Sequence, residues 1–523
     1  MSISKPLYKC THTQKRILII NCYFDHTRQP IHRTFKTPQS MAPVYLAGAF
    51  SAELCDIRIY NEQYSGPLEN EQLFSWPDML VLTGITVAFD RMLHLTAYAR
   101  SKNPNVIVVA GGPPIRALPR YSQRFFDYCC VGDVEQLKEV ITDAFGKAYV
   151  AQEMFPRYDL AYWTGRIGYV ESSRNCNFRC PFCSLTGDGV SYQKYDLEYI
   201  RKQIVALGKK DFIVFLDNNF YGNDRKYFLE RIDLIKELRN AGFFRAWGAL
   251  VTNDFFYKEE NLYLVQKAGC LAMFSGVESF DTQWLQNNKA QNIRFPQVEL
   301  IRKSLDAGVV FLYGLIMDIT SRRIADLQRE IDFIIDTPDI TLPSYLVAPI
   351  PFLGTPFFYE CLAKGTILPK TKLRDLDSAT LSLRPLDTIS EVANFFRNIQ
   401  NLSGYRLRVL RHSLSFYKRY RSKFNTMQMI TALSSGALLC AEKFATSSDW
   451  LSLIFKWKRF RTHISTTETL DAVYKPAFRV DSRYKDYFKP TMVTDESGRL
   501  CEELTEDLII TKKTLVKTDD CVH

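Results

Sequence analysis

The chain lacks the features that define membrane, secreted and fibrous proteins. Its nearest approach to a membrane segment, residues 429–444 (MITALSSGALLCAEKF), is too short and too rich in serine to span a bilayer, so we predict a packed helix there. The apolar run in KRILIINCYF near the N-terminus is too short for the core of a signal peptide and suits a β-strand. No internal repeat or low-complexity segment is evident. We therefore expect a globular protein with no transmembrane segment, since 46% of the residues are hydrophobic and 24% are charged.

The cysteines argue against a disulfide scaffold. There are thirteen, an odd number, and outside one cluster they are scattered irregularly, which favours a reducing, cytoplasmic location. The net charge of +10 is modest for 523 residues and is spread along the chain. This charge indicates a basic solvated surface more than binding to nucleic acid, and we expect no nucleic-acid partner. The length predicts two or three domains.

Residues 16–150 alternate short apolar strands with helices, which predicts a doubly wound (Rossmann-like) parallel sheet. Such sheets bind ligands beyond the carboxyl ends of their strands. The strand ends carry Thr83-Gly84-Ile85-Thr86, Gly111-Gly112 and Gly132-Asp133. The predicted strands lie within residues 16–24, 56–61, 78–86, 105–114 and 126–133. We assign residues 1–150 to this domain and residues 151–165 to a linker.

A second alternating region, residues 166–385, predicts six more strands separated by amphipathic helices. The helices within 225–242 and 296–308 each end in a glycine that suits a helix C-terminus. Six consecutive βα units indicate a partial parallel barrel of the TIM type, with its chemistry at the carboxyl ends of the strands. The predicted strands lie within residues 167–173, 212–219, 244–252, 271–279, 309–318 and 342–350.

From residue 386 the pattern becomes helical, aromatic and basic. We assign residues 386–505 to a C-terminal, mainly helical domain that caps the barrel, and residues 506–523 to a tail. The basic stretches YKRYRSKF (417–424) and KWKRFR (456–461) suit a phosphate, a peptide or a membrane surface, and ordinary solvated helix faces explain them equally well.

Three cysteines lie within eight positions of ESSRNCNFRCPFCSLTG, directly after the first barrel strand: Cys176, Cys180 and Cys183. A structural zinc site needs four ligands, and no nearby histidine or second CxxC supplies the fourth. An iron–sulfur cluster held by three thiolates leaves one iron open to an outside ligand. Three packed structural cysteines remain the alternative to a metal centre.

The Cys176-x3-Cys180-x2-Cys183 spacing at this place resembles the signature of the radical S-adenosylmethionine superfamily, and the resemblance extends over the barrel. It implies a 4Fe-4S cluster whose open iron binds S-adenosylmethionine, which one electron cleaves to a 5′-deoxyadenosyl radical. It also implies an electron donor such as flavodoxin or ferredoxin. Phe182 matches the aromatic position beside the adenine.

Other strand ends fit the same resemblance. FLDNNFYGN resembles the DDNF segment of the subgroup that carries an N-terminal cobalamin domain, so Asp217 and Asn218 are candidates for binding S-adenosylmethionine, although Asn218 replaces the more usual acid. SGVES places Glu278 and Ser279 where a polar group meets the ribose or carboxylate. APIPFLGTPFF (348–358) resembles the P-x-P-G-T-P element of that subgroup. Each segment alone is also explained by turn chemistry or helix capping.

Residues 16–150 resemble the cobalamin-binding domain fused to such barrels. The hydroxyl-then-GG pattern and the VGDVE turn carry this resemblance, although a generic flavodoxin-like sheet would show similar glycines. The D-x-H-x-x-G element that supplies a histidine to cobalt in some families is absent, because Asp25 and His26 are adjacent in YFDHTRQ. The implied cobalamin-binding residues are Thr83, Gly84, Thr86, Gly111, Gly112, Gly132 and Asp133.

The resemblance implies a cobalamin-dependent radical S-adenosylmethionine enzyme that methylates a carbon centre of a small-molecule or natural-product substrate. Enzymes with the same architecture also catalyse cyclisation, rearrangement or dehydration without methyl transfer. A methylthiotransferase fits less well because it needs a second cysteine triad. A degenerate, non-catalytic binding protein is the alternative of another class.

Overall fold

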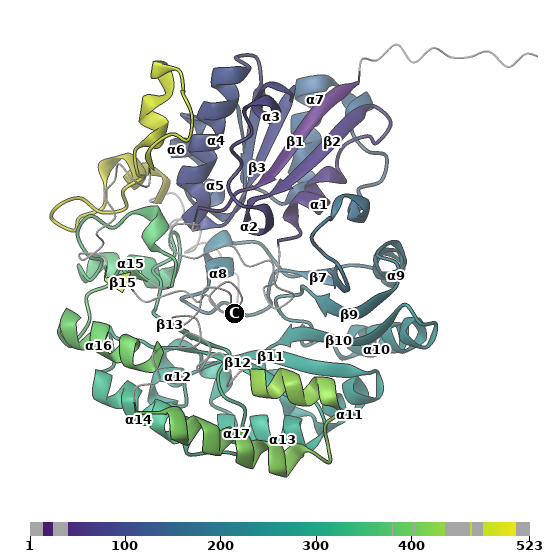
Figure 1. The fold of residues 1–523 in the computed structure, drawn as a ribbon, viewed down its shortest axis with the longest axis vertical. Coiled ribbons are helices and arrows are strands. Elements are labelled where there is room, and N and C mark those ends of the chain that lie inside the picture. Colours follow the sequence, from purple (N-terminus) through teal and green to yellow (C-terminus); the bar gives the residue numbers. More distant parts are fainter. Residues whose placement is uncertain are drawn as a thin grey trace, which may run out of the picture.

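The computed structural model contains two large parallel sheets, which lie one above the other in Figure 1. The first sheet has five strands and the second has six, and helices flank both. This architecture confirms the predicted α/β fold class. The described residues are 14–24, 40–378, 380–400, 404–434, 461–462 and 474–508.

The N-terminal sheet has the strand order β2-β1-β3-β4-β5, and all its pairs are parallel. Its central strands are continuous apolar runs because helices cover both faces, and residues 17–20 of β1 are fully buried. The strands are β1 (Lys15–Asn21), β2 (Cys55–Asn61), β3 (Met79–Thr83), β4 (Ile107–Gly111) and β5 (Tyr128–Cys130). The helices are α1 (Ala42–Ala47), α2 (Glu62–Ser65), α3 (Glu71–Ser75), α4 (Phe89–Lys102), α5 (Pro113–Ala117), α6 (Pro119–Gln123) and α7 (Leu137–Phe145).

The second sheet runs β13-β12-β11-β10-β9-β6, so successive strands of the chain are neighbours, as in a partial βα barrel. All six predicted strands are present: β6 (Ile167–Val170), β9 (Lys210–Phe215), β10 (Phe244–Val251), β11 (Cys270–Glu278), β12 (Val310–Ile316) and β13 (Tyr345–Val347). Its helices are α8 (Ser184–Asp188), α9 (Leu197–Ala206), α10 (Arg225–Asn240), α11 (Glu259–Lys267), α12 (Thr282–Asn288), α13 (Gln297–Asp306), α14 (Ile324–Ile335) and α15 (Pro356–Ala363). Two short strands, β7 (Ser173–Arg174) and β8 (Gln193–Lys194), form an antiparallel pair beside β6.

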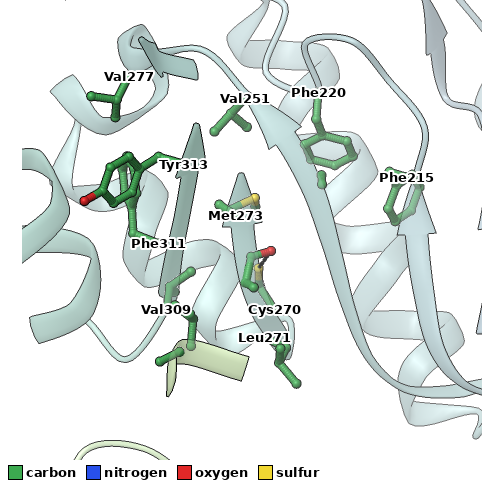
Figure 2. Close-up of a cluster of buried hydrophobic side chains, with 14 of the residues drawn as sticks. Phe215, Phe220, Val251, Cys270, Leu271, Met273, Val277, Val309, Phe311 and Tyr313 are labelled. Carbon is green, nitrogen blue, oxygen red and sulfur yellow. Dashed lines mark hydrogen bonds between the residues drawn. The ribbon is translucent and has the colours of Figure 1, made fainter. Parts of the chain in front are cut away.

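The barrel core consists of large side chains from adjacent strands and the helices that cover them (Figure 2). Trp247 is fully buried, its ring meets Phe215 edge-on with centroids 5.6 Å apart, and its indole N–H donates to the Ala268 carbonyl at 3.1 Å. Helices α10 and α13 are each followed by a glycine in the left-handed region, Gly242 and Gly308, as their sequences predict.

The described C-terminal residues lie in two places. Helices α16 (Ile389–Gln400) and α17 (Arg406–Tyr420) follow the barrel, and the short strands β14 (Thr380–Leu381) and β15 (Arg461–Thr462) pair in parallel. Residues 474–508 instead pack on α4, where the Ala477 amide donates to the Tyr98 hydroxyl at 2.9 Å. The domain boundaries stay predictions, and residues 435–444 of the predicted helix lie outside the described residues. Among the residues that the structure describes, no helix is both long and apolar enough to cross a membrane.

Candidate active site

The three clustered cysteines share one loop between β7 and α8, beyond the carboxyl end of β6. Asn175, with φ 63°, takes the left-handed conformation just before the first of them. Within the loop the Cys183 amide donates to the Cys180 carbonyl at 3.1 Å, and the Thr186 hydroxyl donates to the same oxygen at 2.8 Å. All three thiols are partly buried, and none forms a disulfide within the part of the chain that the structure describes. The loop therefore presents three sulfur donors from a hydrogen-bonded turn, the donor set that suits an iron–sulfur cluster with one open iron.

Hydrogen-bond donors and one positively charged side chain, Lys289, lie near these thiols. The Gln291 side-chain amide donates to Cys180 Sγ at 3.1 Å, and the Phe178 backbone amide donates to Cys176 Sγ at 3.5 Å. Burial raises the pKa of Cys176, and raises that of Cys183 to about 11, while Lys289 acts in the opposite direction on both. Such positive charge favours thiolates, the form that binds metal. Among the described residues, no three His, Cys, Asp or Glu side chains are grouped to bind a single metal ion.

Lys289 is almost fully buried and lies between the cysteine loop and β11. Its ammonium donates to the Gly276 carbonyl at 2.7 Å and forms an ion pair with Glu278 at 2.9 Å. Burial disfavours the charged form, but Glu278 and the thiols of Cys180 and Cys183 outweigh it and raise the pKa of Lys289. The lysine is therefore charged at neutral pH and places a fixed positive charge near the cluster loop.

The two candidates after β9 differ in environment. Asp217 is fully buried and accepts hydrogen bonds from the Ser172 amide at 3.0 Å and the Ser172 hydroxyl at 2.6 Å. It also pairs with the buried Arg231 guanidinium at 3.4 Å. Asn218 is exposed to solvent. The next residue, Asn219, is buried and donates to the side chain of Asn177 in the cysteine loop at 2.7 Å.

The candidates at the end of β11 also make protein contacts. Glu278 adopts a positive φ of 65° at a register shift in the strand, and its carboxylate pairs with Lys289. The buried Ser279 hydroxyl donates to Glu330 at 2.7 Å and accepts from Arg322 at 3.0 Å. Ser279 therefore belongs to a buried ion-pair network.

Phe182 lines a small cavity of about 110 Å³ at the carboxyl ends of β12 and β13. Its ring lies 6.3 Å from that of Trp284, whose indole N–H donates to Asp318 at 2.8 Å. The other lining residues are mostly apolar and include Ile316, Val347 and Phe357. A largely apolar cavity with aromatic walls beside the cysteine loop suits a flat ring such as adenine.

A larger cavity of about 310 Å³ lies where the N-terminal sheet faces the barrel. From the sheet it is lined by the predicted residues Thr83, Gly111, Gly112, Gly132 and Asp133, and from the barrel by Glu171, Arg174 and Leu216. Its volume is at the lower end of the range for small-molecule sites, so it suits part of a larger ligand. Gly84 and Thr86 do not line it.

Gly84 and Gly112 make the close approach at this end of the sheet possible. Gly112 has φ 106°, and a Cβ there would lie 2.6 Å from the Gly84 carbonyl oxygen. A Cβ on Gly84 would lie 3.0 Å from Ala88 Cβ. The two glycines therefore keep the floor beside the cavity free of side chains. Thr86 is buried in the short turn that follows.

Two arginines connect this cavity to the cysteine loop. Arg116, just after the Gly111-Gly112 pair, binds Asp133 at 3.1 Å and Asp188 of α8 at 2.8 Å. Arg174 binds Glu171 at 3.1 Å and Glu135 at 3.1 Å. Burial raises the pKa of Asp188, and Arg116 opposes that rise.

Several residues near the site carry no motif signal that sequence reasoning could use. Lys289 and Gln291 follow α12 in an unremarkable polar stretch, and Arg116 and Asp188 look like ordinary surface charges. Asp254, in VTNDFF after β10, could have been found as a polar residue at a strand end. Its Oδ2 is buried and has no hydrogen-bond partner among the described residues, and its charge acts on Cys176. Because S-adenosylmethionine carries an ammonium and a sulfonium, an unsatisfied carboxylate oxygen at this place suits that ligand.

Comparisons with known proteins find similarity in sequence and in fold. The family model described as "Radical SAM superfamily" matches residues 170–332. The hopanoid C-2 methylase of Rhodopseudomonas palustris (strain TIE-1) is 23% identical over 308 residues, which cover 54% of this chain and 57% of the relative. An uncharacterised methyltransferase of Synechocystis sp. is 22% identical over 348 residues, 62% of this chain and 63% of the relative. The chain thus spans less than two thirds of the length of these two relatives.

A solved structure matches nearly the whole chain. It is the cobalamin-dependent S-adenosylmethionine radical enzyme OxsB with aqua-cobalamin bound, with a TM-score of 0.55 and 15% sequence identity. The match covers 97% of this chain and 81% of the other. At this identity the likeness concerns the fold alone.

Proposed function

We propose that the chain is a cobalamin-dependent radical S-adenosylmethionine enzyme that methylates a carbon centre of a small-molecule substrate. The family model over residues 170–332 supports the radical chemistry, and the Rossmann-like sheet before the barrel supports the cobalamin site. One observation carries the cobalamin part of the proposal. The 310 Å³ cavity lies at the carboxyl ends of the N-terminal strands and is also lined by residues that adjoin the cysteine loop. Two relatives named as methyltransferases support methyl transfer.

In this proposal Cys176, Cys180 and Cys183 hold the cluster, and Phe182 and Asp254 contact S-adenosylmethionine. When bound, the cluster would supply the electron that cleaves S-adenosylmethionine, and cobalamin would supply the methyl group. The N-terminal cavity would hold cobalamin between the sheet and the barrel. A small electron-transfer protein is the expected source of the electron.

The chain's own task is to orient these groups and to keep water away. Arg116 holds α8, and with it the cysteine loop, against the end of the N-terminal sheet. Apolar side chains such as Val81, Val109 and Leu216 line the cavity, so few solvent molecules would compete for a reactive species there.

Metal analysis after anaerobic reconstitution with iron, sulfide and hydroxocobalamin tests the two cofactor sites separately. We expect about four irons and one cobalt per chain. The variant with Cys176→Ala, Cys180→Ala and Cys183→Ala loses iron and keeps cobalt. Gly112→Ala keeps iron and loses cobalt, because its Cβ would clash with the Gly84 carbonyl. The matched control is Gly146→Ala, since Gly146 also has a positive φ, of 100°, but open space around it.

The products then distinguish methyl transfer from other radical chemistry. A methylating enzyme that consumes two molecules of S-adenosylmethionine gives both S-adenosylhomocysteine and 5′-deoxyadenosine. Formation of 5′-deoxyadenosine alone would indicate that the enzyme catalyses a cyclisation, rearrangement or dehydration instead of a methylation. Iron without cobalt in the unmodified protein would overturn the cobalamin site, and absence of bound iron would overturn the whole proposal.

A further inference from the structure

Large apolar side chains are exposed on α17 and on the following helical residues 426–434. Six large apolar side chains there are between 45% and 69% exposed. On α17 they are three or four positions apart, which places them on one side of the helix. We call this surface the α17 face, and it consists of Leu407, Leu410, Leu414, Tyr417, Met427 and Ile430.

The opposite side of α17 already forms the contact with the barrel. Val409, Phe416 and Tyr420 are buried. The two ring nitrogens of His412 lie 3.0 Å from the carbonyl oxygens of Ile335 and Ile340, at the end of α14 and beyond it. Figure 1 places α17 in the outer helical layer, next to α13 and α14. The helix is therefore fixed by its inner side, and the exposed leucines are not needed for that packing.

The same segment is strongly basic. Residues 404–434 contain seven lysines and arginines and no aspartate or glutamate. Three of the seven form ion pairs with the barrel: Arg408 with Asp332 and Asp336, Arg419 with Asp339, and Lys423 with Asp306. The other four are exposed and have no ion pair among the described residues; they are Arg406, Arg411, Lys418 and Arg421.

We propose that the α17 face binds the surface of a lipid bilayer that contains anionic lipid. A solvated basic helix explains the charges but not the leucines, whereas a purely apolar interface explains the leucines but not the charges. A bilayer surface satisfies both, because leucines enter the boundary between headgroups and acyl chains while flanking arginines and lysines reach the anionic headgroups. A nucleic acid would gain little from five aliphatic side chains and a single tyrosine.

The charges predict a measurable affinity for anionic vesicles. Each Lys or Arg near an anionic surface strengthens binding about fivefold, and the attraction weakens as salt is added. Reversing two of these charges should therefore weaken binding by at least about 25-fold. Binding to uncharged vesicles should be much weaker for every form of the protein.

Cosedimentation with unilamellar vesicles tests the proposal on the full chain. The vesicles contain either phosphatidylcholine alone or phosphatidylcholine with about one third phosphatidylglycerol. We expect the wild-type protein to sediment with the anionic vesicles. Two double variants should no longer sediment with these vesicles: Arg411→Glu with Lys418→Glu, and Leu410→Glu with Leu414→Glu. The matched control is Lys226→Glu with Arg245→Glu, which changes the net charge equally at sites whose side chains are 88% and 81% exposed on the α10 and β10 side of the barrel.

The outcomes separate the bilayer from other occupants of the face. Unchanged iron content shows that the variants are folded, and the test does not depend on cobalamin or on the reaction. Equal sedimentation with both kinds of vesicle, or equal loss in the Lys226→Glu, Arg245→Glu control, overturns the proposal. Failure of the wild-type protein to bind overturns it too. If sedimentation velocity then shows a dimer that the α17 variants dissociate, a second copy covers the face instead.

Discussion

Gln291 offers a direct test of how the protein adjusts the proposed cluster. Its side-chain amide donates to Cys180 Sγ at 3.1 Å, within the limit for a hydrogen bond to sulfur. Hydrogen bonds to cluster sulfurs raise the reduction potential, because they stabilise the more negative, reduced state more than the oxidised state. Gln291→Leu keeps a similar volume and removes the donor. We therefore expect it to lower the potential.

The size of the shift follows from the energy of one hydrogen bond. A hydrogen bond to a charged group contributes about 1.5–3 kcal/mol, of which we assign about 1 kcal/mol to the difference between the two redox states. For a one-electron couple, 59 mV corresponds to a tenfold change in the equilibrium constant, or about 1.4 kcal/mol, so the expected shift is about 40 mV downward. Gln291→Glu places a negative charge beside the sulfur and should lower the potential further.

The assay is a redox titration of the reconstituted protein, without S-adenosylmethionine, followed by electron paramagnetic resonance. Gln266→Leu is the control, because Gln266 is an exposed residue of α11. A potential for Gln291→Leu that equals that of wild type, at unchanged iron content, would refute the reasoning. A fall of the same size in the control would show that the shift does not come from the bond to Cys180.

Two further predictions concern stability. Asp217→Asn should lower the free energy of unfolding by about 3–5 kcal/mol, because it leaves the Arg231 guanidinium, 1% exposed, without its carboxylate; an unchanged urea midpoint would contradict this. In the folded protein Asp90 is buried and accepts hydrogen bonds from Tyr474 and Thr491. Burial raises the pKa of Asp90 to about 6, above its unfolded value of 3.8. The folded state thus holds this proton more tightly, so stability from Asp90 is present at low pH and is lost as the pH rises through 6. Relative to Asp90→Asn, the wild type should lose about 1 kcal/mol between pH 5 and pH 7 in urea unfolding, and parallel pH profiles would exclude this role.

The strands were predictable because their signal is local. A buried parallel strand is a short apolar run between turn residues, and β1, β3 and β4 each have this form. All eleven strands of the two sheets lie within or overlap the predicted segments. The cysteine spacing is also local, so it predicts the loop, its place after β6 and the superfamily whose model matches residues 170–332, without knowledge of any distant contact.

Side-chain partners were not predictable, because they come from distant parts of the chain. Asp217 stands at a strand end, where a ligand contact and a structural contact have the same sequence signal. In the fold, α10 brings Arg231 against it, and Ser172 arrives from the loop after β6. Ser279 likewise meets Glu330 from α14. Which strand-end residues are left to face a ligand depends on these pairings, so their roles remain predictions while the strand ends themselves are established.

The spacing between the two proposed cofactor sites is also set by a distant pairing. The predicted linker, residues 151–165, does not by itself fix how two domains face each other. The ion pair between Arg116 and Asp188 does so locally, because it joins the segment after Gly112 to the helix that follows Cys183 at 2.8 Å. Both side chains are more than four-fifths buried, so water screens the pair less than it screens a surface pair. A ligand in the 310 Å³ cavity would lie against Arg116, which is paired with the helix that follows the cysteine loop, so we expect occupancy of one site to affect the geometry of the other.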